Sequence, residues 1–312
     1  MSIPAVSVVV PVYNSEQSLL ELIGRLGRVL SARGEYEIIL VDDGSVDGSR
    51  AAIRRLARDQ AFVHGIFLMR NFGQHNALLA GIRAARFPMI VTLDDDLQNP
   101  PEEIPKLLAK LDEGYDVVYG VPSRTRQTLS RRLASKLVRF ALRGAMGRER
   151  AAIVSQFRAF RTQLRSAFED YAAPFVSIDV LLSWGAARFA ALRVEHVARP
   201  LGRSQYSFVK LMSHAISMIT GFSSWPLRFA SIVGFVFTLF GIGVFTFVVA
   251  RYLVVGRSVP GFPFLASIIA IFSGAQLFAL GIIGEYLARV HFRMMNRPPY
   301  VLDSSENESK MR

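Results

Sequence analysis

The sequence contains no cysteine, which excludes disulfide bonds, thiolate metal ligands and cysteine nucleophiles. The N-terminal stretch also lacks the features of a signal peptide. Residues 1–12 have neither a basic n-region nor a cleavage site, and their apolar residues are typical of a strand. We therefore expect the first domain to remain in the cytosol.

Acidic residues are in short supply, because 25 Asp and Glu residues stand against 37 Lys and Arg residues, for a formal net charge of +12. This excess suits an anionic membrane surface, an acidic substrate or nucleic acid. Nucleic acid is disfavoured, because aromatic residues are sparse in the basic stretch and no known DNA- or RNA-binding motif occurs. The hydrophobic fraction of 51% and the mean hydropathy of +0.29 favour a membrane segment.

Short apolar runs alternate with stretches of helical spacing in the N-terminal part. The runs are residues 6–12, 37–41, 65–69 and 89–93. This alternation predicts an α/β domain with a mostly parallel sheet that is covered by helices on both faces. In such sheets, ligands bind beyond the carboxyl ends of the strands.

Polar clusters follow each predicted strand. They are Tyr13 with Asn14, Asp42 with Asp43, residues 71–74 and residues 94–98. These loops are predicted to face one crevice. The alternative is that turns are simply polar wherever they occur.

The strongest signal is the acidic run Asp94, Asp95 and Asp96 after the fourth apolar run. Adjacent carboxylates repel one another unless a cation neutralises them, and oxygen ligands suit Mg²⁺ or Mn²⁺. Such an ion would bridge diphosphate oxygens and stabilise a leaving nucleotide. The alternative is a helix cap or a solvent loop, although Pro100 and Pro101 already provide a helix start.

Residues 124–150 form a basic segment in which Glu149 is the one acid. Leu129, Leu133 and Phe140 fall on one helical face, which predicts a basic amphipathic helix on an anionic membrane surface. The alternative is an ordinary helix with a solvated charged face.

Two uncharged apolar stretches, residues 229–250 and 259–284, each exceed the roughly 20 residues that cross a bilayer core. Arg228 precedes the first stretch, and Arg289 and Arg293 follow the second. The positive-inside rule therefore places both ends in the cytosol, joined by an outer turn. A pore or transporter is disfavoured, because transporters need more spans.

Several motifs in a fixed order point to a family: VVVPVYNSE at residues 8–16, VDDGS at residues 41–45 and LDDDLQNPPE at residues 93–102. Together they resemble the family 2 glycosyltransferases of the GT-A fold, a Rossmann-like fold for nucleotide sugars. The apolar stretches and the segment GRSQYS at residues 202–207 are similar to the polyprenyl-phosphate glycosyltransferases. That subfamily includes dolichol-phosphate mannose synthases, GtrB-type glucosyltransferases and ArnC-like transferases. The resemblance covers nearly the whole chain.

The resemblance implies a set of site residues. Nucleotide-binding residues would be Pro11, Tyr13, Asn14, Glu16, Asp42, Asp43 and Asp95. Asp94 and Asp96 would be catalytic and would bind Mg²⁺ or Mn²⁺ together with Gln98. The acceptor phosphate would be bound by Arg124, Arg126, Arg131, Arg132 and Ser135, since guanidinium groups match phosphate oxygens in two-pronged contacts.

Many relatives carry an acid before the Phe157–Arg158 pair, where this chain has Gln156. ArnC-like members also lack that acid, so the chain resembles them more closely. A phosphate monoester with a second pKa near 6 is largely ionised at neutral pH and needs no general base.

The resemblance therefore implies an inverting enzyme that moves a sugar from a nucleotide diphosphate to a polyprenyl phosphate at the cytoplasmic face of a bacterial inner membrane. It favours UDP as the nucleotide and undecaprenyl phosphate as the acceptor. The alternatives are a polysaccharide synthase of the same family and a non-catalytic, membrane-tethered scaffold that binds nucleotide sugars. The sequence does not identify the sugar or the metal.

The expected organisation is a cytosolic GT-A domain at residues 1–204, a juxtamembrane helix at 205–225, a two-span hairpin at 226–288 and a cytosolic tail at 289–312. Small residues such as Gly234 and Gly281 would let the spans approach other helices closely. By resemblance we expect a homo-oligomer, a tetramer in some relatives.

Overall fold

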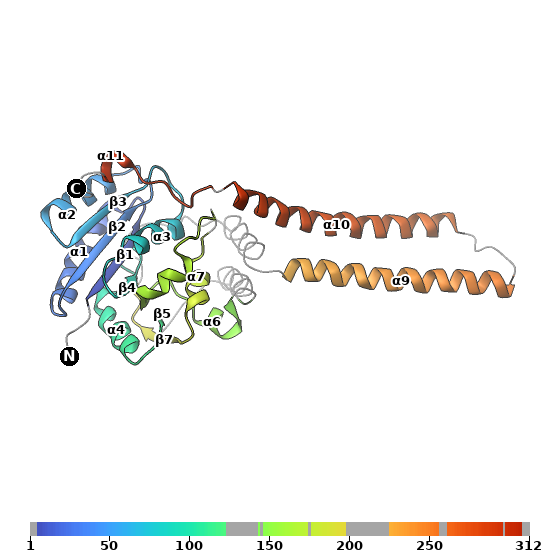
Figure 1. The fold of residues 1–312 in the computed structure, drawn as a ribbon, viewed down its shortest axis with the longest axis horizontal. Helices are drawn as coiled ribbons and strands as arrows, with labels where there is room; N and C mark the ends of the chain where they lie inside the picture. Colours follow the sequence, from blue (N-terminus) through green and yellow to red (C-terminus); the bar gives the residue numbers. More distant parts are fainter. Residues whose placement is uncertain are drawn as a thin grey trace.

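The structure, a computed structural model, describes residues 5–122, 143, 146–173, 176–197, 225–255, 261–295 and 297–307. A seven-stranded sheet is covered by helices, and two long helices project from this domain (Figure 1). The expected α/β class is confirmed.

The sheet is mixed but mostly parallel. Its strands are β1 (Val6–Val12), β2 (Tyr36–Asp42), β3 (Val63–Phe67), β4 (Met89–Thr92), β5 (Val117–Pro122), β6 (Arg158–Arg161) and β7 (Phe189–Val194), in the spatial order β3-β2-β1-β4-β6-β5-β7. Strand β6 runs antiparallel to both β4 and β5, whereas the other described pairs are parallel. The first four strands match the predicted runs, with β3 two residues earlier than expected.

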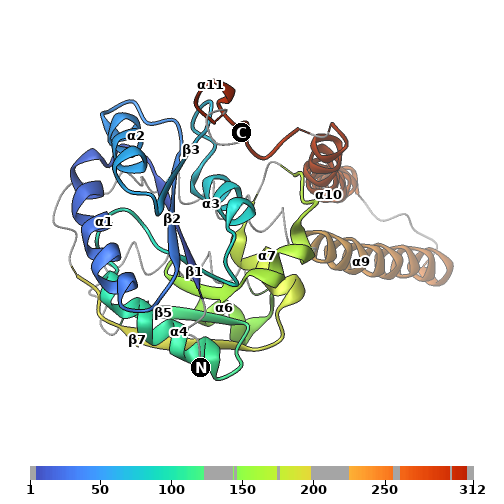
Figure 2. The ribbon, with the colours of Figure 1, turned by 60° about the vertical axis from the view of Figure 1, so that its left-hand side comes forward.

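Helices cover both faces of the sheet (Figure 2). The longer helices of this domain are α1 (Glu16–Ser31), α2 (Ser49–Asp59), α3 (Gln74–Ala84), α4 (Ile104–Asp112) and α7 (Ile178–Gly185), and the shorter ones are α6 (Arg148–Ile153) and the 3-10 helices Pro101–Glu103 and Thr162–Phe168. The domain therefore has the layered arrangement that buries a parallel sheet.

Alternate residues of β1 belong to different layers of the core, as the two-residue period of a strand requires. Val8 packs in the same cluster as Leu22 of α1, whereas Val9 packs with Leu79 of α3 on the opposite face. Gly81 of α3 lies so close to β1 that a Cβ there would be 2.3 Å from Val9 Cγ1. Helix α3 can approach the sheet this closely only because residue 81 has no side chain.

Two long apolar helices follow the domain, α9 (Trp225–Val255) and α10 (Phe262–Met294). They lie side by side, and the ring of Phe272 lies 5.4 Å from that of Phe237 between centroids (Figure 1). Leu227–Arg251 and Ile271–Ala288 are long and apolar enough to cross a membrane, with mean hydropathies of 2.5 and 1.4. Both predicted apolar spans are thus present as helices. Helix α10 continues past residue 284, where the predicted apolar stretch ends, and no proline interrupts it between Pro263 in its first turn and Pro298.

The structure divides the predicted cytosolic tail at residues 289–312 into two parts. Residues 289–294 complete α10, and residues 300–307 return to the sheet domain, where Leu302 forms an antiparallel bridge with Leu68 beside β3 (Figure 1). The short helix α11 (Ser304–Asn307) follows that bridge. We call residues 300–307 the C-terminal segment.

Some predicted features lie outside the described residues. They are the acceptor residues Arg124, Arg126, Arg131, Arg132 and Ser135, the segment at residues 202–207 and residues 205–224 of the predicted juxtamembrane helix. Trp225, which was expected to end that helix, is instead the first residue of α9. Of the basic segment, Arg148 and Glu149 begin α6.

Candidate active site

The loops after β1, β2 and β4 meet at the carboxyl edge of the sheet. In the strand register β1 and β2 end side by side at Val12 and Asp42, whereas β4 ends at Thr92 beside Val9, three residues before the end of β1. The Tyr13 N–H donates to Asp95 Oδ2 at 3.3 Å, which joins the loop after β1 to the acidic run after β4. The predicted convergence of these loops is therefore present.

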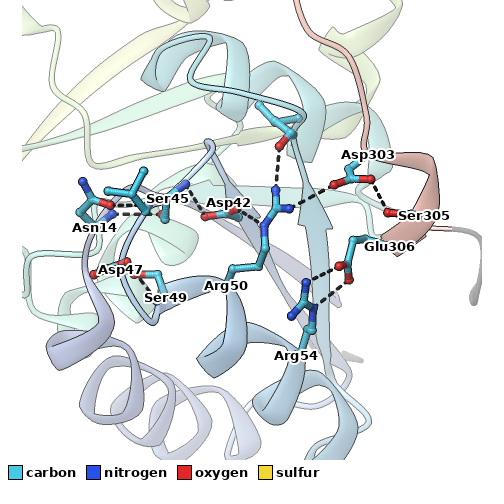
Figure 3. Close-up of polar contacts among 12 residues, drawn as sticks. Asn14, Asp42, Ser45, Asp47, Ser49, Arg50, Arg54, Asp303, Ser305 and Glu306 are labelled. Carbon is cyan, nitrogen blue, oxygen red and sulfur yellow. Dashed lines mark hydrogen bonds and ion pairs between the residues drawn. The ribbon is translucent and has the colours of Figure 1, made fainter.

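Residues 13–16 and 42–49 form a hydrogen-bonded structure that we call the rim. Asn14 Oδ1 accepts from the Val46 N–H at 2.9 Å, and Ser45 Oγ accepts from the Asn14 N–H at 3.1 Å (Figure 3). Glu16 Oε2 accepts from the Gly48 N–H at 3.2 Å. Side-chain oxygens of each loop thus accept hydrogen bonds from backbone N–H groups of the other, so the two loops form a single unit.

The backbone of this region adopts left-handed conformations at several positions. Asn14 has φ 55° and Leu97 has φ 59°, and Gly44 has φ 70°. A Cβ on Gly44 would lie 2.5 Å from the Arg70 carbonyl carbon, so glycine is required there. Non-glycine residues with a left-handed backbone conformation are uncommon in proteins, and they concentrate at binding sites. Beside them, Tyr13 is 42% exposed and offers its ring to a planar ligand.

Asp42 is completely buried at the end of β2, and its carboxylate is fully engaged by this chain's own donors. Oδ1 accepts from the Ser45 N–H at 3.1 Å, and Oδ2 accepts from Arg50 Nε at 2.9 Å (Figure 3). The Asp42 carboxylate is the buried base of the rim, and it fixes the turn at residues 42–45.

Asp43 is buried as well, and it fixes the loop after β3. Its carboxylate accepts from the Phe72 N–H at 2.7 Å and from the Gly73 N–H at 2.9 Å. Burial raises the pKa of Asp43 to about 6, although both N–H donors favour the charged form. The charge of Asp42 beside it also raises this pKa.

Asp94, Asp95 and Asp96 are each partly buried in the loop after β4. We call residues 94–98 the acidic loop. Burial, followed by the charges of Asp96 and Asp95, raises the pKa of Asp94 to about 7. Asp96 Oδ1 accepts from the Gln98 N–H at 3.1 Å, which closes the turn. Asp94 therefore lies in an environment where burial and two neighbouring carboxylates disfavour its charged form.

A polar network under Asp94 was missed by the sequence analysis. Gln74 Nε2 donates to Asp94 Oδ1 at 2.6 Å, and Gln156 Nε2 donates to Gln74 Oε1 at 3.2 Å. Gln156 thus reaches the acidic loop through Gln74. The cluster at residues 71–74 was recognised in the sequence, but the pairing with Gln156 is a long-range contact.

Arg158 supplies a buried positive charge to the same region. It is completely buried, donates from Nε to Thr92 Oγ1 at 2.9 Å and pairs with Asp179. Its charge favours the ionised form of Asp94 and so lowers the pKa of that residue.

The acidic loop fits a hard divalent cation. Its carboxylate and amide oxygens are the ligands that Mg²⁺ and Mn²⁺ prefer. Within the part of the chain that the structure describes, no three His, Cys, Asp or Glu side chains are arranged to hold an ion by themselves. An ion here would therefore complete its coordination with Gln98, water and the phosphate oxygens of a ligand, as Mg²⁺ commonly does.

The chain after β7 comes close to the acidic loop, because the Val197 N–H donates to the Gln98 carbonyl oxygen at 3.0 Å. This contact brings the start of the connection to α9 to the edge of the candidate site. Residues 198–224, which follow, lie outside the described residues.

Comparison with known proteins defines the class of this chain. The model of glycosyl transferase family 2 matches residues 7–172, which include β1 to β6, the rim and the acidic loop. The chain belongs to glycosyl transferase family 2. A solved structure of glucosyl-3-phosphoglycerate synthase from Mycobacterium tuberculosis with Mn²⁺, UDP-glucose and phosphoglyceric acid has a TM-score of 0.52 and 20% identity. That likeness covers 70% of this chain and 79% of the synthase, and it shows the shared GT-A fold.

More similar relatives match almost the whole chain. The undecaprenyl-phosphate 4-deoxy-4-formamido-L-arabinose transferase of Shewanella sediminis is 39% identical over 96% of this chain and 92% of its own length. The protein with the same description from Enterobacter sp. is 36% identical over 96% of this chain and 93% of its own length. These matches extend through both apolar helices, so the similarity is not limited to the sheet domain. The resemblance to the polyprenyl-phosphate subfamily is thereby confirmed.

Proposed function

We propose that this chain transfers 4-deoxy-4-formamido-L-arabinose from UDP to undecaprenyl phosphate, with inversion at the anomeric carbon. The observation that carries the proposal is the similarity to two transferases of that description over 96% of the chain. The arrangement of the acidic loop beside the rim supports it, because it offers a place for a diphosphate next to a place for a nucleoside.

The donor binds across the rim and the acidic loop. The exposed ring of Tyr13 packs against the base, and Asn14, Glu16 and Asp95 lie beside the ribose. Asp42, Asp43 and Pro11 act from beneath, because they are buried and hold the loops in place.

Asp94, Asp96 and Gln98 would hold Mg²⁺ or Mn²⁺, which when bound neutralises the diphosphate and stabilises the leaving nucleotide. A neighbour with the same fold was crystallised with Mn²⁺ and UDP-glucose. Gln74 and Arg158 keep Asp94 in place and favour its charged form.

The reaction is a single in-line displacement. A phosphate oxygen of the acceptor forms a bond to the anomeric carbon, while the bond from that carbon to the diphosphate oxygen breaks and its electron pair leaves with UDP. Because a phosphate monoester is largely ionised at neutral pH, no side chain has to remove a proton. Gln156 can therefore stand where other family members have an acid, and the protein contributes mainly position. The acceptor phosphate would be bound by Arg124, Arg126, Arg131, Arg132 and Ser135.

The acceptor is a lipid, and the hairpin of α9 and α10 would hold the enzyme in the bilayer with its sheet domain at the cytoplasmic face. The return of the C-terminal segment to β3 supports this topology, since both ends of the hairpin must then lie on one side of the membrane. The basic segment at residues 124–150 would lie at the anionic surface. Small residues on the helices favour a homo-oligomer.

The test is to incubate the detergent-purified protein with undecaprenyl phosphate, Mn²⁺ and radiolabelled UDP-sugars, and to measure label in the organic phase. We expect labelled lipid with the formamido sugar, and its loss in Asp96→Asn. The matched control is Asp112→Asn, which changes an exposed carboxylate at the end of α4. Labelled polymer would favour a polysaccharide synthase, and binding without turnover would favour a scaffold.

A further inference from the structure

The C-terminal segment packs on the sheet domain as an additional edge strand. The Met69 N–H donates to the Val301 carbonyl oxygen at 3.0 Å, and the Asp303 N–H donates to the Phe67 carbonyl oxygen at 2.9 Å. These bonds flank the Leu68–Leu302 bridge. Residues that follow the second apolar helix thus pair with the chain just after β3, the strand at this edge of the sheet.

Side chains anchor this segment just after α10. Pro299 is buried, and Tyr300 packs against the core cluster that contains Leu79. The guanidinium of Arg83 lies 5.8 Å from the centroid of the Tyr300 ring. Pro298 and Pro299 restrict the backbone between the helix and this anchor. The position of the C-terminal segment is therefore tied to the end of α10.

Arg50 of α2 connects the segment to the buried carboxylate beneath the rim. Its Nε donates to Asp42 Oδ2 at 2.9 Å, its Nη1 to Asp303 Oδ2 at 3.1 Å and its Nη2 to the Leu68 carbonyl oxygen at 2.8 Å (Figure 3). Each nitrogen of the guanidinium is thus engaged, and its plane is fixed. Ser305 Oγ donates to the other oxygen of Asp303 at 2.6 Å, which orients that carboxylate.

A second ion pair in the same segment has no such connection. Glu306 pairs with Arg54, one helical turn after Arg50, and Arg54 Nε donates to Glu306 Oε2 at 2.8 Å (Figure 3). Within the described part of the chain, Arg54 contacts Glu306 and the Phe67 ring but not Asp42. The two pairs are therefore matched in location and chemistry but differ in their link to the rim.

We propose that the C-terminal segment is part of the donor site, with Asp303 acting through Arg50 as a positioning residue for Asp42 and hence for the turn at residues 42–45. This inference rests on the proposed role of the rim in nucleotide binding. The physical reason is that Asp42 is buried and depends on one charged partner, Arg50, which is itself oriented by Asp303. The donor site is thus completed by residues that lie beyond the membrane hairpin.

The test measures the affinity for UDP by calorimetry and the KM for the donor and for undecaprenyl phosphate, using the full-length protein in detergent. In Asp303→Ala we expect the donor KM and the Kd for UDP to rise about three- to fivefold, as for the loss of a partly exposed charge-assisted contact. The kcat and the acceptor KM should stay within about twofold, a range that corresponds to less than ~0.5 kcal/mol. Asp303→Asn keeps an acceptor oxygen and should recover part of the donor affinity.

Glu306→Ala is the control, and it should leave the donor KM unchanged while its melting temperature falls as much as that of Asp303→Ala. In an Arg50→Ala background, Asp303→Ala should have no further effect on the donor KM. Equal effects of Asp303→Ala and Glu306→Ala on donor affinity, or additive effects of Arg50→Ala and Asp303→Ala, would overturn the inference. Asp42→Asn separates the failure of the proposed function from the failure of this inference. Unchanged UDP affinity in Asp42→Asn would refute the proposed role of the rim. Reduced UDP affinity in Asp42→Asn, together with wild-type UDP affinity in Asp303→Ala, would refute only the role of Asp303.

Discussion

Two acidic clusters follow strands β2 and β4, which lie on either side of β1, and they differ in how their charge is neutralised. At the end of β2, Asp42 and Asp43 are buried, and every carboxylate oxygen accepts a hydrogen bond from Arg50 or from backbone N–H groups. At the end of β4, Asp94 has a pKa raised to about 7 by burial and by its acidic neighbours. In the first cluster every carboxylate oxygen is hydrogen-bonded by the protein, whereas in the second three consecutive carboxylates lie side by side in one loop.

The difference shows that two clusters of adjacent aspartates can have opposite physical roles. A carboxylate that is saturated by donors stabilises the loops around it, and its removal leaves those donors buried and unpaired. A group of carboxylates that repel one another lowers the stability of the folded protein unless a cation binds to them. Such a group is therefore expected to serve in binding. Mutations in the two clusters should therefore have different signatures.

The largest expected effect on activity belongs to the acidic loop. Asp94→Asn and Asp96→Asn should each lower the rate of sugar transfer by at least about 100-fold, because metal stabilisation of the leaving group contributes several kcal/mol. The melting temperature of the metal-free protein should stay the same or rise, since like charges are removed. Transfer assays and thermal melts with and without Mn²⁺ provide the measurement.

The control for this prediction is Asp112→Asn, which should retain both activity and the stabilisation by Mn²⁺ together with UDP. A variant of Asp94 or Asp96 that melts far below the wild type without metal would show that the acidic loop is structural. That outcome would remove the contrast between the two clusters.

The next largest effect should come from Asp42→Asn, and it should appear as lost stability. The change removes the charge that binds Arg50, so about 2 kcal/mol of unfolding free energy should be lost, discounted because Arg50 is partly exposed. The Kd for UDP should rise as the turn at residues 42–45 loosens. Chemical denaturation and calorimetry would measure the two effects, and a stable variant with wild-type affinity would contradict this assignment.

A smaller effect concerns the pH dependence of stability at Asp43. Its pKa in the folded protein is about 6, above the ordinary value of 3.8. Between these values the folded state keeps a proton that the unfolded state has lost, so the contribution of Asp43 to stability is full below pH 3.8 and is lost as the pH rises through 6. The loss should be on the order of 1 to 2 kcal/mol.

Asp43→Asn removes this titration, so its stability relative to the wild type should increase between pH 4.5 and pH 7. Thermal melts of both proteins across this range would measure the difference. Parallel curves for the two proteins would mean that the hydrogen bonds from Phe72 and Gly73 keep Asp43 ionised throughout.

Much of the fold could be predicted from local patterns. The β1 run, the helical spacing of Leu19 and Leu22 and the two apolar helices each depend on the order of apolar residues along the chain, which the sequence displays directly. The convergence of Tyr13 and the acidic run could also be predicted, because parallel strands bring their carboxyl ends to one edge.

The features that were missed depend on contacts between distant parts of the chain. Strand β6 lies antiparallel between β4 and β5, and Gln156 reaches Asp94 through Gln74. Asp303, which follows the two apolar helices in the sequence, pairs with Arg50. No local periodicity encodes such pairings. The packing of residues 300–307 on the sheet domain was not predicted for this reason, since a short polar segment after an apolar helix gives no signal that it will pair with a strand.

The central claim is that the acidic loop binds a divalent cation that in turn holds the diphosphate of the donor. The most direct test is calorimetric titration of UDP into the purified protein, with Mn²⁺ and with a chelator in its place. The account predicts clear binding with Mn²⁺, a Kd at least about tenfold higher with the chelator, and no such metal dependence in Asp96→Asn. Equal affinity for UDP with and without the divalent ion in the wild-type protein would contradict it.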